Sequence, residues 1–284
     1  MSGPRIGLLA DIQYGDLPDR GSCRFRSSLQ RLEAAVEDLN LRGCDLVLQL
    51  GDIIEGHVDR RAADAAAAGE TAASAPTALE RSRRDLEAVL EVLSRLEAPL
   101  EHVVGNHCLA IPRDELQGRL GIEAPWRLRR VGQLQVALLD SMFLSPLGHE
   151  GGPTRSEEEQ QLLEAHAGAP WALPWNGAFG AEQLAWLGGV LAEGGPLLIA
   201  SHHPVLPAAA RSAFLAWDHE AGLRLLEGTR AGGPRLWVSG HDHRGGRGLR
   251  AGVEFRTLEG VVAGGGGACV DLIGPDLERY SWLP

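Results

Sequence analysis

The chain has 284 residues, of which 44% are hydrophobic, enough to bury one large core. Acidic residues outnumber basic ones by 38 to 27, which gives a formal net charge of -11. A nucleic-acid polymer or an anionic membrane requires a basic face on its partner, so this charge balance argues against both. Small phosphorylated molecules remain open as partners, provided that cations neutralise the local field. The sequence carries no signal for an oligomeric state.

The cysteines and the N-terminus indicate a cellular compartment. Cys23, Cys44, Cys108 and Cys269 are scattered and form no CxxC pair. In a chain of this length, the pattern predicts reduced thiols. The apolar run in MSGPRIGLLAD is too short for a signal peptide, and no run is long enough to span a membrane. We therefore expect a cytoplasmic protein.

Apolar runs typical of buried strands recur along the chain, and polar residues follow the main five. These five are RIGLLAD (5–11), DLVLQLGD (45–52), LEHVVGNH (100–107), GPLLIASHH (195–203) and PRLWVSGHDH (234–243). Similar runs are LQVALLD (134–140), VEFRTLEG (253–260) and ACVDLIG (268–274).

Helical patterns lie between these runs. Leucines and valines on one face predict a helix over 29–39 that ends at Gly43, and a capping box at Thr77 and Glu80 begins another. Two more are expected over 182–193 and 218–227. This alternation predicts an α/β layered fold. We expect one domain over 1–284, with insertions near 57–77 and 145–175.

The polar residues after the strands form a possible metal-binding set. They are two carboxylates, two amides and several imidazoles, namely Asp11, Gln13, Asp52, Asn106, His107, His202, His241 and His243. Such nitrogen and oxygen ligands suit Mn²⁺, Fe²⁺ or Zn²⁺, whereas a thiolate site requires cysteine. Each motif alone is more often a turn or an ordinary histidine. Their shared position at strand ends favours a metal site, because polar loops meet there in α/β folds.

The order D-x-Q, GD, GNH, SHHP and GHDH, from Asp11 to His243, resembles the calcineurin-like metallophosphoesterases. The pattern of that family is D-x-H, GD, GNH followed by an acid, GH and GHxH. The resemblance implies a four-layer α/β/β/α sandwich with a dinuclear metal site on loops at the carboxyl ends of strands. It implies one metal held by Asp11, Gln13, Asp52 and His243, and a second held by Asp52, Asn106, His202 and His241.

A narrower resemblance explains the glutamine of D-x-Q. ADIQY is similar to the same segment of the manganese-dependent ADP-ribose/CDP-alcohol diphosphatases, a branch of the family. WNGAFGAEQLAWL (175–187), LAW (215–217), HRGG (243–246) and LEGV (258–261) are similar to that branch too. The carbonyl oxygen of Gln13 is a neutral, hard ligand that suits Mn²⁺. Two divalent ions are therefore expected, Mn²⁺ first and Fe²⁺ or Zn²⁺ as alternatives.

The branch implies an activity. A hydroxide bridging the two metals would cleave the diphosphate bond of ADP-ribose or a CDP-alcohol, and His107 would protonate the leaving group. One alternative is a phosphodiesterase or phosphomonoesterase of the same family, acting on cyclic nucleotides or other small phosphoesters. A second is an interaction module without turnover, suggested by Cys108 where the family has an acid. Asp16, Glu55 or another carboxylate could replace that acid beside His107.

Substrate contacts are the least defined part of the sequence. Arg24 and Arg26 follow the first strand, and Arg244 and Arg247 follow the last motif, so each could meet a distal phosphate. The alternative is that these arginines are solvated surface residues. His203 could contact phosphate or shape the HHP turn.

Overall fold

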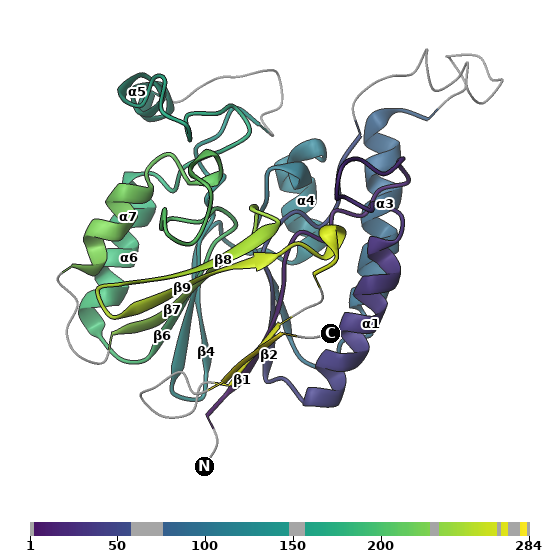
Figure 1. The fold of residues 1–284 in the computed structure, drawn as a ribbon, viewed down its shortest axis with the longest axis horizontal. Coiled ribbons are helices and arrows are strands. Elements are labelled where there is room, and N and C mark those ends of the chain that lie inside the picture. Colours follow the sequence, from purple (N-terminus) through teal and green to yellow (C-terminus); the bar gives the residue numbers. More distant parts are fainter. Residues whose placement is uncertain are drawn as a thin grey trace.

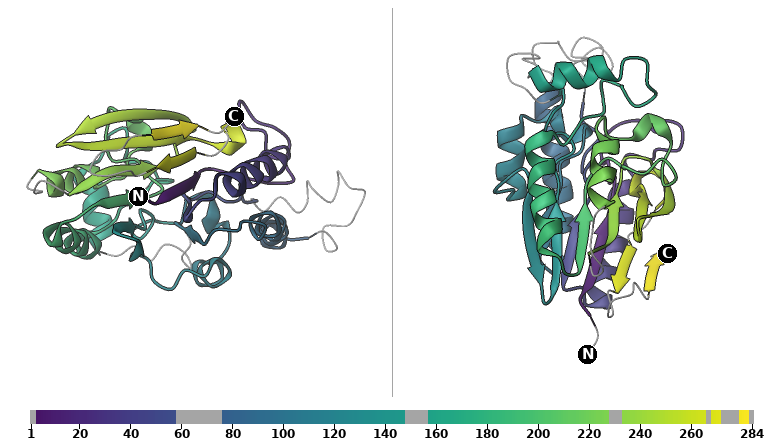
Figure 2. Two further views of the ribbon diagram at one scale, coloured as in Figure 1. Left: turned by 90° about the horizontal axis from the view of Figure 1, so that it is seen from below. Right: turned by 90° about the vertical axis from the view of Figure 1, so that its left-hand side faces the viewer.

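The computed structural model describes residues 3–57, 76–147, 157–227, 233–265, 268–271 and 279–282. Two β-sheets pack face to face, and helices cover the outer face of each sheet (Figures 1 and 2). This arrangement is the expected α/β/β/α sandwich. In the described part of the chain, no helix is long and apolar enough to cross a membrane.

The first sheet has five strands in the order β11-β10-β1-β2-β3. Their bounds are Arg279–Trp282, Ala268–Asp271, Arg5–Leu9, Leu46–Gln49 and Leu100–His102. β1, β2 and β3 are parallel, whereas β10 and β11 join antiparallel at one edge. Parallel strands require crossover connections. Helices α1 (Ser28–Arg42) and α3 (Ala78–Leu93) provide them and cover the outer face.

The second sheet has six strands in the order β4-β5-β6-β7-β9-β8. Their bounds are Arg127–Val131, Leu134–Leu138, Leu197–Ala200, Pro234–Ser239, Val253–Glu259 and Arg244–Arg250. The four inner strands are parallel, and β4 and β8 are antiparallel edge strands. Helices α6 (Ala181–Glu193) and α7 (His219–Leu226) cover the outer face.

Aliphatic side chains fill the space between the sheets, and each outer sheet face packs on its helices. Leu8, Leu48, Val136, Leu198 and Val238 belong to the layer between the sheets. The predicted buried strands are confirmed, since every residue of β2, β5 and β6 is buried. Burial of both faces explains why these strands have continuous apolar sequences.

The predicted helix ends are also confirmed. Gly43 follows α1 with a φ of 61°, a left-handed conformation that glycine adopts readily. Thr77 and Glu80 form the capping box of α3: Thr77 Oγ1 accepts the Glu80 N–H at 3.1 Å, and Glu80 Oε2 accepts the Thr77 N–H at 2.6 Å. Two backbone donors are thereby satisfied.

Other elements were not predicted from the sequence. Helix α4 (Arg113–Leu120) buries only Leu116 and Leu120 among its residues, too few for an apolar period. The edge strands β4 (RLRRV) and β8 (RGGRGLR) are rich in arginine or glycine and lack alternating apolar residues.

The two predicted insertions are described only in part. Residues 58–75 and 148–156 lie outside the described residues. Within the second insertion, helix α5 (Glu157–Ala165) precedes a loop whose Trp171 packs edge-on against His219, with ring centroids 4.8 Å apart. The loop therefore lies against the start of α7.

A buried histidine at the end of β3 should make the fold sensitive to acid. Burial and the charge of Arg127 lower the pKa of His102 to about 3. The unfolded chain has an ordinary histidine pKa of about 6.5, so below that pH only the unfolded state gains a proton. The free energy of unfolding then decreases as the pH is lowered below about 6.5. At pH 5 it is about 2 kcal/mol smaller than at neutral pH.

We expect His102→Phe to remove this loss. Gln49 Oε1, which lies 3.4 Å from His102 Nδ1, keeps its bond from the Gly51 N–H at 3.2 Å. The difference in unfolding free energy between pH 7.5 and pH 5, measured with urea, should shrink by about 2 kcal/mol. An unchanged difference would show that His102 is protonated in the folded protein.

Candidate metal centre

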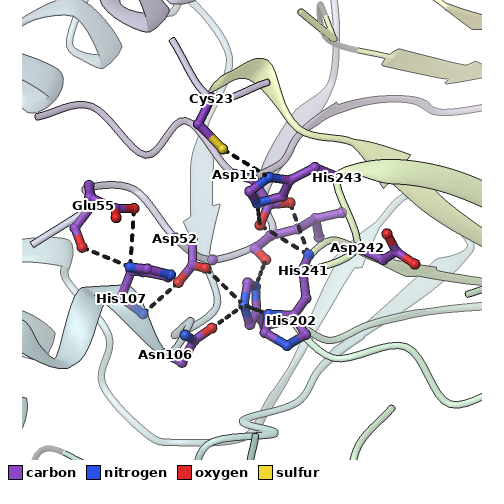
Figure 3. Close-up of polar contacts among 12 residues, drawn as sticks. Asp11, Cys23, Asp52, Glu55, Asn106, His107, His202, His241, Asp242 and His243 are labelled. Atoms are coloured by element: carbon purple, nitrogen blue, oxygen red, sulfur yellow. Dashed lines mark hydrogen bonds and ion pairs between the residues drawn. The ribbon is translucent and has the colours of Figure 1, made fainter. Parts of the chain in front are cut away.

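The loops after five strands bring most of the predicted ligands into one cluster (Figure 3), and Gln13 lies on the same loop as Asp11. The first sheet supplies Asp11 and Gln13 after β1, Asp52 after β2 and Asn106 after β3. The second sheet supplies His202 after β6, and His241 and His243 after β7. Residues far apart in the sequence thus share one buried cluster, because the carboxyl ends of parallel strands lie at one edge.

Four atoms that could bind a metal converge on one side of the cluster. His202 Nε2 lies 3.3 Å from Asp52 Oδ2, 3.2 Å from Asn106 Oδ1 and 3.1 Å from His241 Nδ1. The ligand atoms of Asp52, His202 and His241 all lie within 4.8 Å of one another. This set matches the residues expected to hold the second metal.

Burial lowers the pKa of His202, but the charge of Asp52 more than offsets this and raises it, so the site attracts positive charge, and the tautomer of the neutral ring decides which atom faces the cluster. His202 Nδ1 lies 2.8 Å from the Leu50 carbonyl oxygen, which can only accept, so Nδ1 carries the hydrogen. In a neutral imidazole, Nε2 then presents a lone pair toward the oxygens of Asp52 and Asn106. Lone pairs facing one another without a donor are what a cation site requires.

The other side of the cluster contains Asp11, Gln13 and His243. His243 Nε2 lies 3.6 Å from Asp11 Oδ1, and the Asp11 carboxylate accepts the His241 N–H at 2.9 Å. The side-chain oxygen of Gln13 and Oδ2 of Asp52 are buried with no hydrogen-bond partner among the described residues. A buried oxygen without a partner is costly unless a cation occupies its position.

His243 shows how strongly this side attracts positive charge. Burial alone would lower its pKa, but hydrogen bonds to Asp11 and Cys23 and their charges raise the pKa to about 10. Cys23 Sγ lies 3.7 Å from His243 Nδ1, a contact that the sequence did not predict. Without metal, a proton on His243 balances the Asp11 carboxylate.

The backbone is strained at the ligand positions. Asp11, Gln13, Asp52 and His241 have φ angles of 49°, 40°, 51° and 67°. Only one other described non-glycine residue, Ala251, has a positive φ. Such conformations cost on the order of 1–3 kcal/mol each and persist where the surrounding structure enforces them. The strain is thus concentrated on the loops that carry the candidate ligands.

Two glycines of the GD and GNH motifs allow this crowding. A Cβ atom on Gly105 would lie 2.2 Å from Asp52 Oδ1, and one on Gly51 would lie 2.4 Å from His202 Nδ1. Neither position has room for a side chain. The motif glycines therefore permit the close approach of the ligand loops rather than merely marking turns.

His107 lies beside the cluster and is oriented by Glu55. Its Nδ1 lies 2.8 Å from the Glu55 carbonyl oxygen and 3.2 Å from Glu55 Oε2, and its backbone N–H donates to Asp52 Oδ1 at 2.9 Å. Arg20 Nη2 donates to the other Glu55 oxygen at 2.7 Å. Of the two acids considered from the sequence, the structure places Glu55 beside His107, whereas Asp16 pairs with Arg26.

Cys108 has no part in orienting His107. The thiol is fully buried and accepts the Ile53 N–H at 3.4 Å. Burial, together with the charge of Asp52, raises its pKa to about 12, so the thiol stays protonated. Cys108 therefore packs under the Asp52 loop, and its presence in place of an acid leaves the His107–Glu55 contact intact.

The residues predicted to contact substrate lie outside the cluster. Arg24 donates to the Gly21 carbonyl at 2.8 Å, Arg26 donates to Asp16, and Arg244 is exposed on β8. None of the side-chain contacts described for them reaches a cluster residue. His203 is buried, with Nδ1 2.9 Å from Ser141 Oγ and its ring 4.2 Å from that of His241. It lies beneath the cluster rather than at its surface.

Several residues near the site were missed by sequence reasoning. Arg211 pairs with Asp242 at 2.6 Å and stacks on Phe214 at 4.1 Å, and the Phe214 ring lies 5.2 Å from that of His241. Asn176 contacts His241 directly. Only the GHDH motif, which contains Asp242, could have indicated the Arg211 pair.

A pocket of about 630 Å³ lies next to Glu55. Arg20, Phe25, His57 and Arg81 also line it. His57 is fixed there, because Asp85 Oδ2 lies 2.7 Å from its Nε2 and Arg81 donates to its Nδ1 at 3.2 Å. A volume of this size is within the range of small-molecule sites.

The profile of the calcineurin-like phosphoesterases matches residues 4–245. The chain belongs to the calcineurin-like phosphoesterase family. The residues that the match spans include every ligand candidate described above.

Individual relatives show which members of the family this chain is similar to. This phosphoesterase is 30% identical to a protein of Danio rerio named manganese-dependent ADP-ribose/CDP-alcohol diphosphatase, over 90% of this chain and 87% of the relative. Proteins of the same name from Homo sapiens and Oryza sativa are 27% and 26% identical, each over 90% of this chain and over 82% and 83% of the relative. A crystal structure of a dimetal phosphatase from Danio rerio is similar with a TM-score of 0.80 at 28% identity, covering 96% of this chain and 94% of the other.

The residues present fit divalent metals. The buried Gln13 oxygen has no hydrogen-bond partner among the described residues, and Asp52 Oδ2 lies against His202 Nε2, the ring nitrogen that is not bonded to the Leu50 carbonyl. The residues at the strand ends offer oxygen atoms and imidazole nitrogens but no thiolate. Such a set of ligands suits Mn²⁺.

Proposed function

We propose that this phosphoesterase is a Mn²⁺-dependent hydrolase of the diphosphate bond in nucleoside diphosphate-linked compounds, such as ADP-ribose or CDP-alcohols. The observation that carries the proposal is the buried Gln13 oxygen without a partner beside Asp52, because it supports glutamine as a metal ligand. The names of the relatives from fish, human and rice support the substrate class.

The ligand assignment follows from the two sides of the cluster. Asp11, Gln13, Asp52 and His243 would hold one ion, and Asp52, Asn106, His202 and His241 would hold the other. Asp52 is suited to join the two sets, because one carboxylate oxygen faces His202 and its carbonyl accepts the Gln13 N–H at 2.8 Å, which ties the Gln13 loop to it. When bound, two such ions supply a nucleophile from water at neutral pH and neutralise charge on the phosphate.

His107 is suited to protonate the leaving phosphate. The Glu55 carbonyl accepts the Nδ1–H of His107, so any second proton is carried on Nε2. The Glu55 carboxylate, 3.2 Å from Nδ1, holds the same side of the ring. His107 can therefore give the Nε2 proton to the departing oxygen while Nδ1 remains bonded to Glu55.

The pocket beside Glu55 is the proposed position for one end of the substrate. It adjoins the residue that orients His107, and Arg20 at its wall has a side chain that is 72% exposed. A guanidinium in this position can contact a phosphate or a sugar hydroxyl. Small phosphorylated compounds fit this description better than a polymer does.

We also propose a cytoplasmic location. Cys23, Cys44 and Cys108 form no disulfide with any residue that the structure describes, which supports a reducing compartment.

The test of the proposed function uses metal-stripped protein reloaded with Mn²⁺. It is offered ADP-ribose, CDP-choline and a cyclic nucleotide, and the products are separated by anion exchange. We expect AMP or CMP to appear only with Mn²⁺. Hydrolysis of the cyclic nucleotide alone would favour the phosphodiesterase. Two bound Mn²⁺ without turnover of any of the three would contradict the proposal and favour an interaction module.

A further inference from the structure

His241 has a different partner at each ring nitrogen. Nδ1 faces the cluster, 3.1 Å from His202 Nε2. Nε2 points away from it and lies 2.8 Å from Asn176 Oδ1. Both side chains are buried, so water does not compete for this contact. Asn176 comes from the WNGAFG segment before α6, far from the GHDH motif in the sequence.

The neighbours of Asn176 determine which end of its amide faces His241. The amide nitrogen donates to the Trp171 carbonyl at 3.0 Å and to the Ala213 carbonyl at 2.9 Å. Carbonyl oxygens only accept, so the amide cannot be turned round without placing oxygen against oxygen. Oδ1 must therefore accept a hydrogen from His241 Nε2.

This hydrogen bond determines the state of the other nitrogen. With the hydrogen on Nε2, a neutral His241 has its lone pair on Nδ1, the atom that faces Asp52 and His202. A histidine that ligates a metal commonly donates its second N–H to such an outer partner, which fixes tautomer and ring orientation. We infer that Asn176 is a positioning residue of the metal centre, which holds His241 ready to bind; this inference rests on the proposed function.

The loop that carries Asn176 is fixed from several directions. Ala178 pairs with Leu144 through two backbone hydrogen bonds of 2.9 and 3.1 Å. Trp217 donates its backbone N–H to the Gly177 carbonyl at 2.9 Å. A Cβ atom on Gly177 would lie 2.6 Å from the Ser141 carbonyl oxygen, so the backbone there is closely packed. The Asn176 amide is thus held in place before any metal binds. Little conformational entropy is therefore lost when His241 ligates the metal.

The competing explanation is that Asn176 only stabilises the fold. Gln183 provides the matched control for this alternative. Its amide is also buried, accepts the Asp140 N–H at 2.8 Å, and donates to the Asp140 and Phe179 carbonyls at 2.9 Å. All three bonds go to backbone and none reaches the cluster. Gln183→Met therefore removes an equivalent amide without touching a ligand.

The experiment is a Mn²⁺ titration of the full, metal-stripped chain, followed by the electron paramagnetic resonance signal of free Mn²⁺. We expect the unaltered protein to bind two ions. Asn176→Leu should weaken one of them by about 10–100-fold, the usual effect of losing an outer partner. Asn176→Asp should keep both, because one carboxylate oxygen still accepts the His241 N–H, while the loss of the two donors to the Trp171 and Ala213 carbonyls lowers the Tm. Both variants, and Gln183→Met, should lower the Tm of the metal-free protein.

Three results would overturn the inference, the third together with the proposed function. Unchanged Mn²⁺ affinity in Asn176→Leu, with a loss of Tm like that of Gln183→Met, would make Asn176 structural. Equal loss of affinity in Asn176→Leu and Asn176→Asp would mean that acceptance of the His241 N–H is not what matters. If the unaltered chain bound no Mn²⁺, the proposed function would fail first and this inference with it.

Discussion

Asp52→Asn is expected to lower kcat by about 10³-fold or more, because it removes the carboxylate shared by both proposed ligand sets. An amide carries no charge and offers a single oxygen. The buried side chain cannot be replaced by water, since Asp52 is 1% exposed. Mn²⁺ binding should fall from two ions to one or none. Steady-state kinetics with ADP-ribose and metal analysis after gel filtration would measure both effects.

Asp218→Asn is the control for this substitution. Asp218 is also a buried carboxylate, and it accepts the backbone N–H groups of Phe179 and Gly180 rather than facing the cluster. Burial raises its pKa to about 6, and its partners are backbone N–H groups, so an asparagine there removes a buried carboxylate without changing the charge of the cluster. We expect Asp218→Asn to retain two ions and its kcat. A retained kcat in Asp52→Asn would contradict the assignment of Asp52 as a shared ligand.

The strands and the clustering of the candidate ligands could be predicted from the sequence for one physical reason. Strands buried on both faces are continuous apolar runs, and the carboxyl ends of parallel strands must meet. Asp11, Asp52 and His202 each follow such a run directly, so their proximity required no knowledge of side-chain geometry. The capping box at Thr77 is a local signal of the same reliability, because its two hydrogen bonds lie within four residues.

The outer partners of the ligands could not be predicted in the same way. Asn176 and His241 are 65 residues apart in the sequence, and their contact depends on how one loop packs against another. Arg211 and Asp242 pair across 31 residues for the same reason. The positive φ angle of Asp11 could not be predicted from the sequence either. Aspartate adopts such angles too rarely for its presence to indicate a strained backbone.

The GNH motif shows why a local departure from a family pattern can mislead. Cys108 takes the place of an acid, and from the sequence this suggested an interaction module without turnover. The structure places Glu55, which follows the GD motif, in contact with His107 Nδ1. Orientation depends on which carboxylate reaches the ring in space, not on which residue follows it in the chain.

If His107 is the general acid, His107→Ala is expected to lower kcat by about 10²–10⁴-fold, the usual contribution of such a positioned group. Two Mn²⁺ should remain bound to this variant. The loss should lie toward the lower end, because a leaving phosphate with a second pKa of about 6 departs more easily than an alkoxide. Cys108→Ala is expected to leave kcat unchanged. Loss of both ions in His107→Ala would instead make His107 a part of the ligand set.

Glu55→Gln separates orientation from other roles of this carboxylate. Alone, it should lower kcat by about 10–100-fold, as the loss of an outer partner does at comparable sites. In the His107→Ala background it should have little further effect, because a residue that acts through His107 has nothing left to orient. An equal loss in both backgrounds would place the role of Glu55 elsewhere, in its pairing with Arg20 at the pocket wall. The double-mutant cycle thus distinguishes an acid that positions the catalytic histidine from one that shapes the substrate pocket.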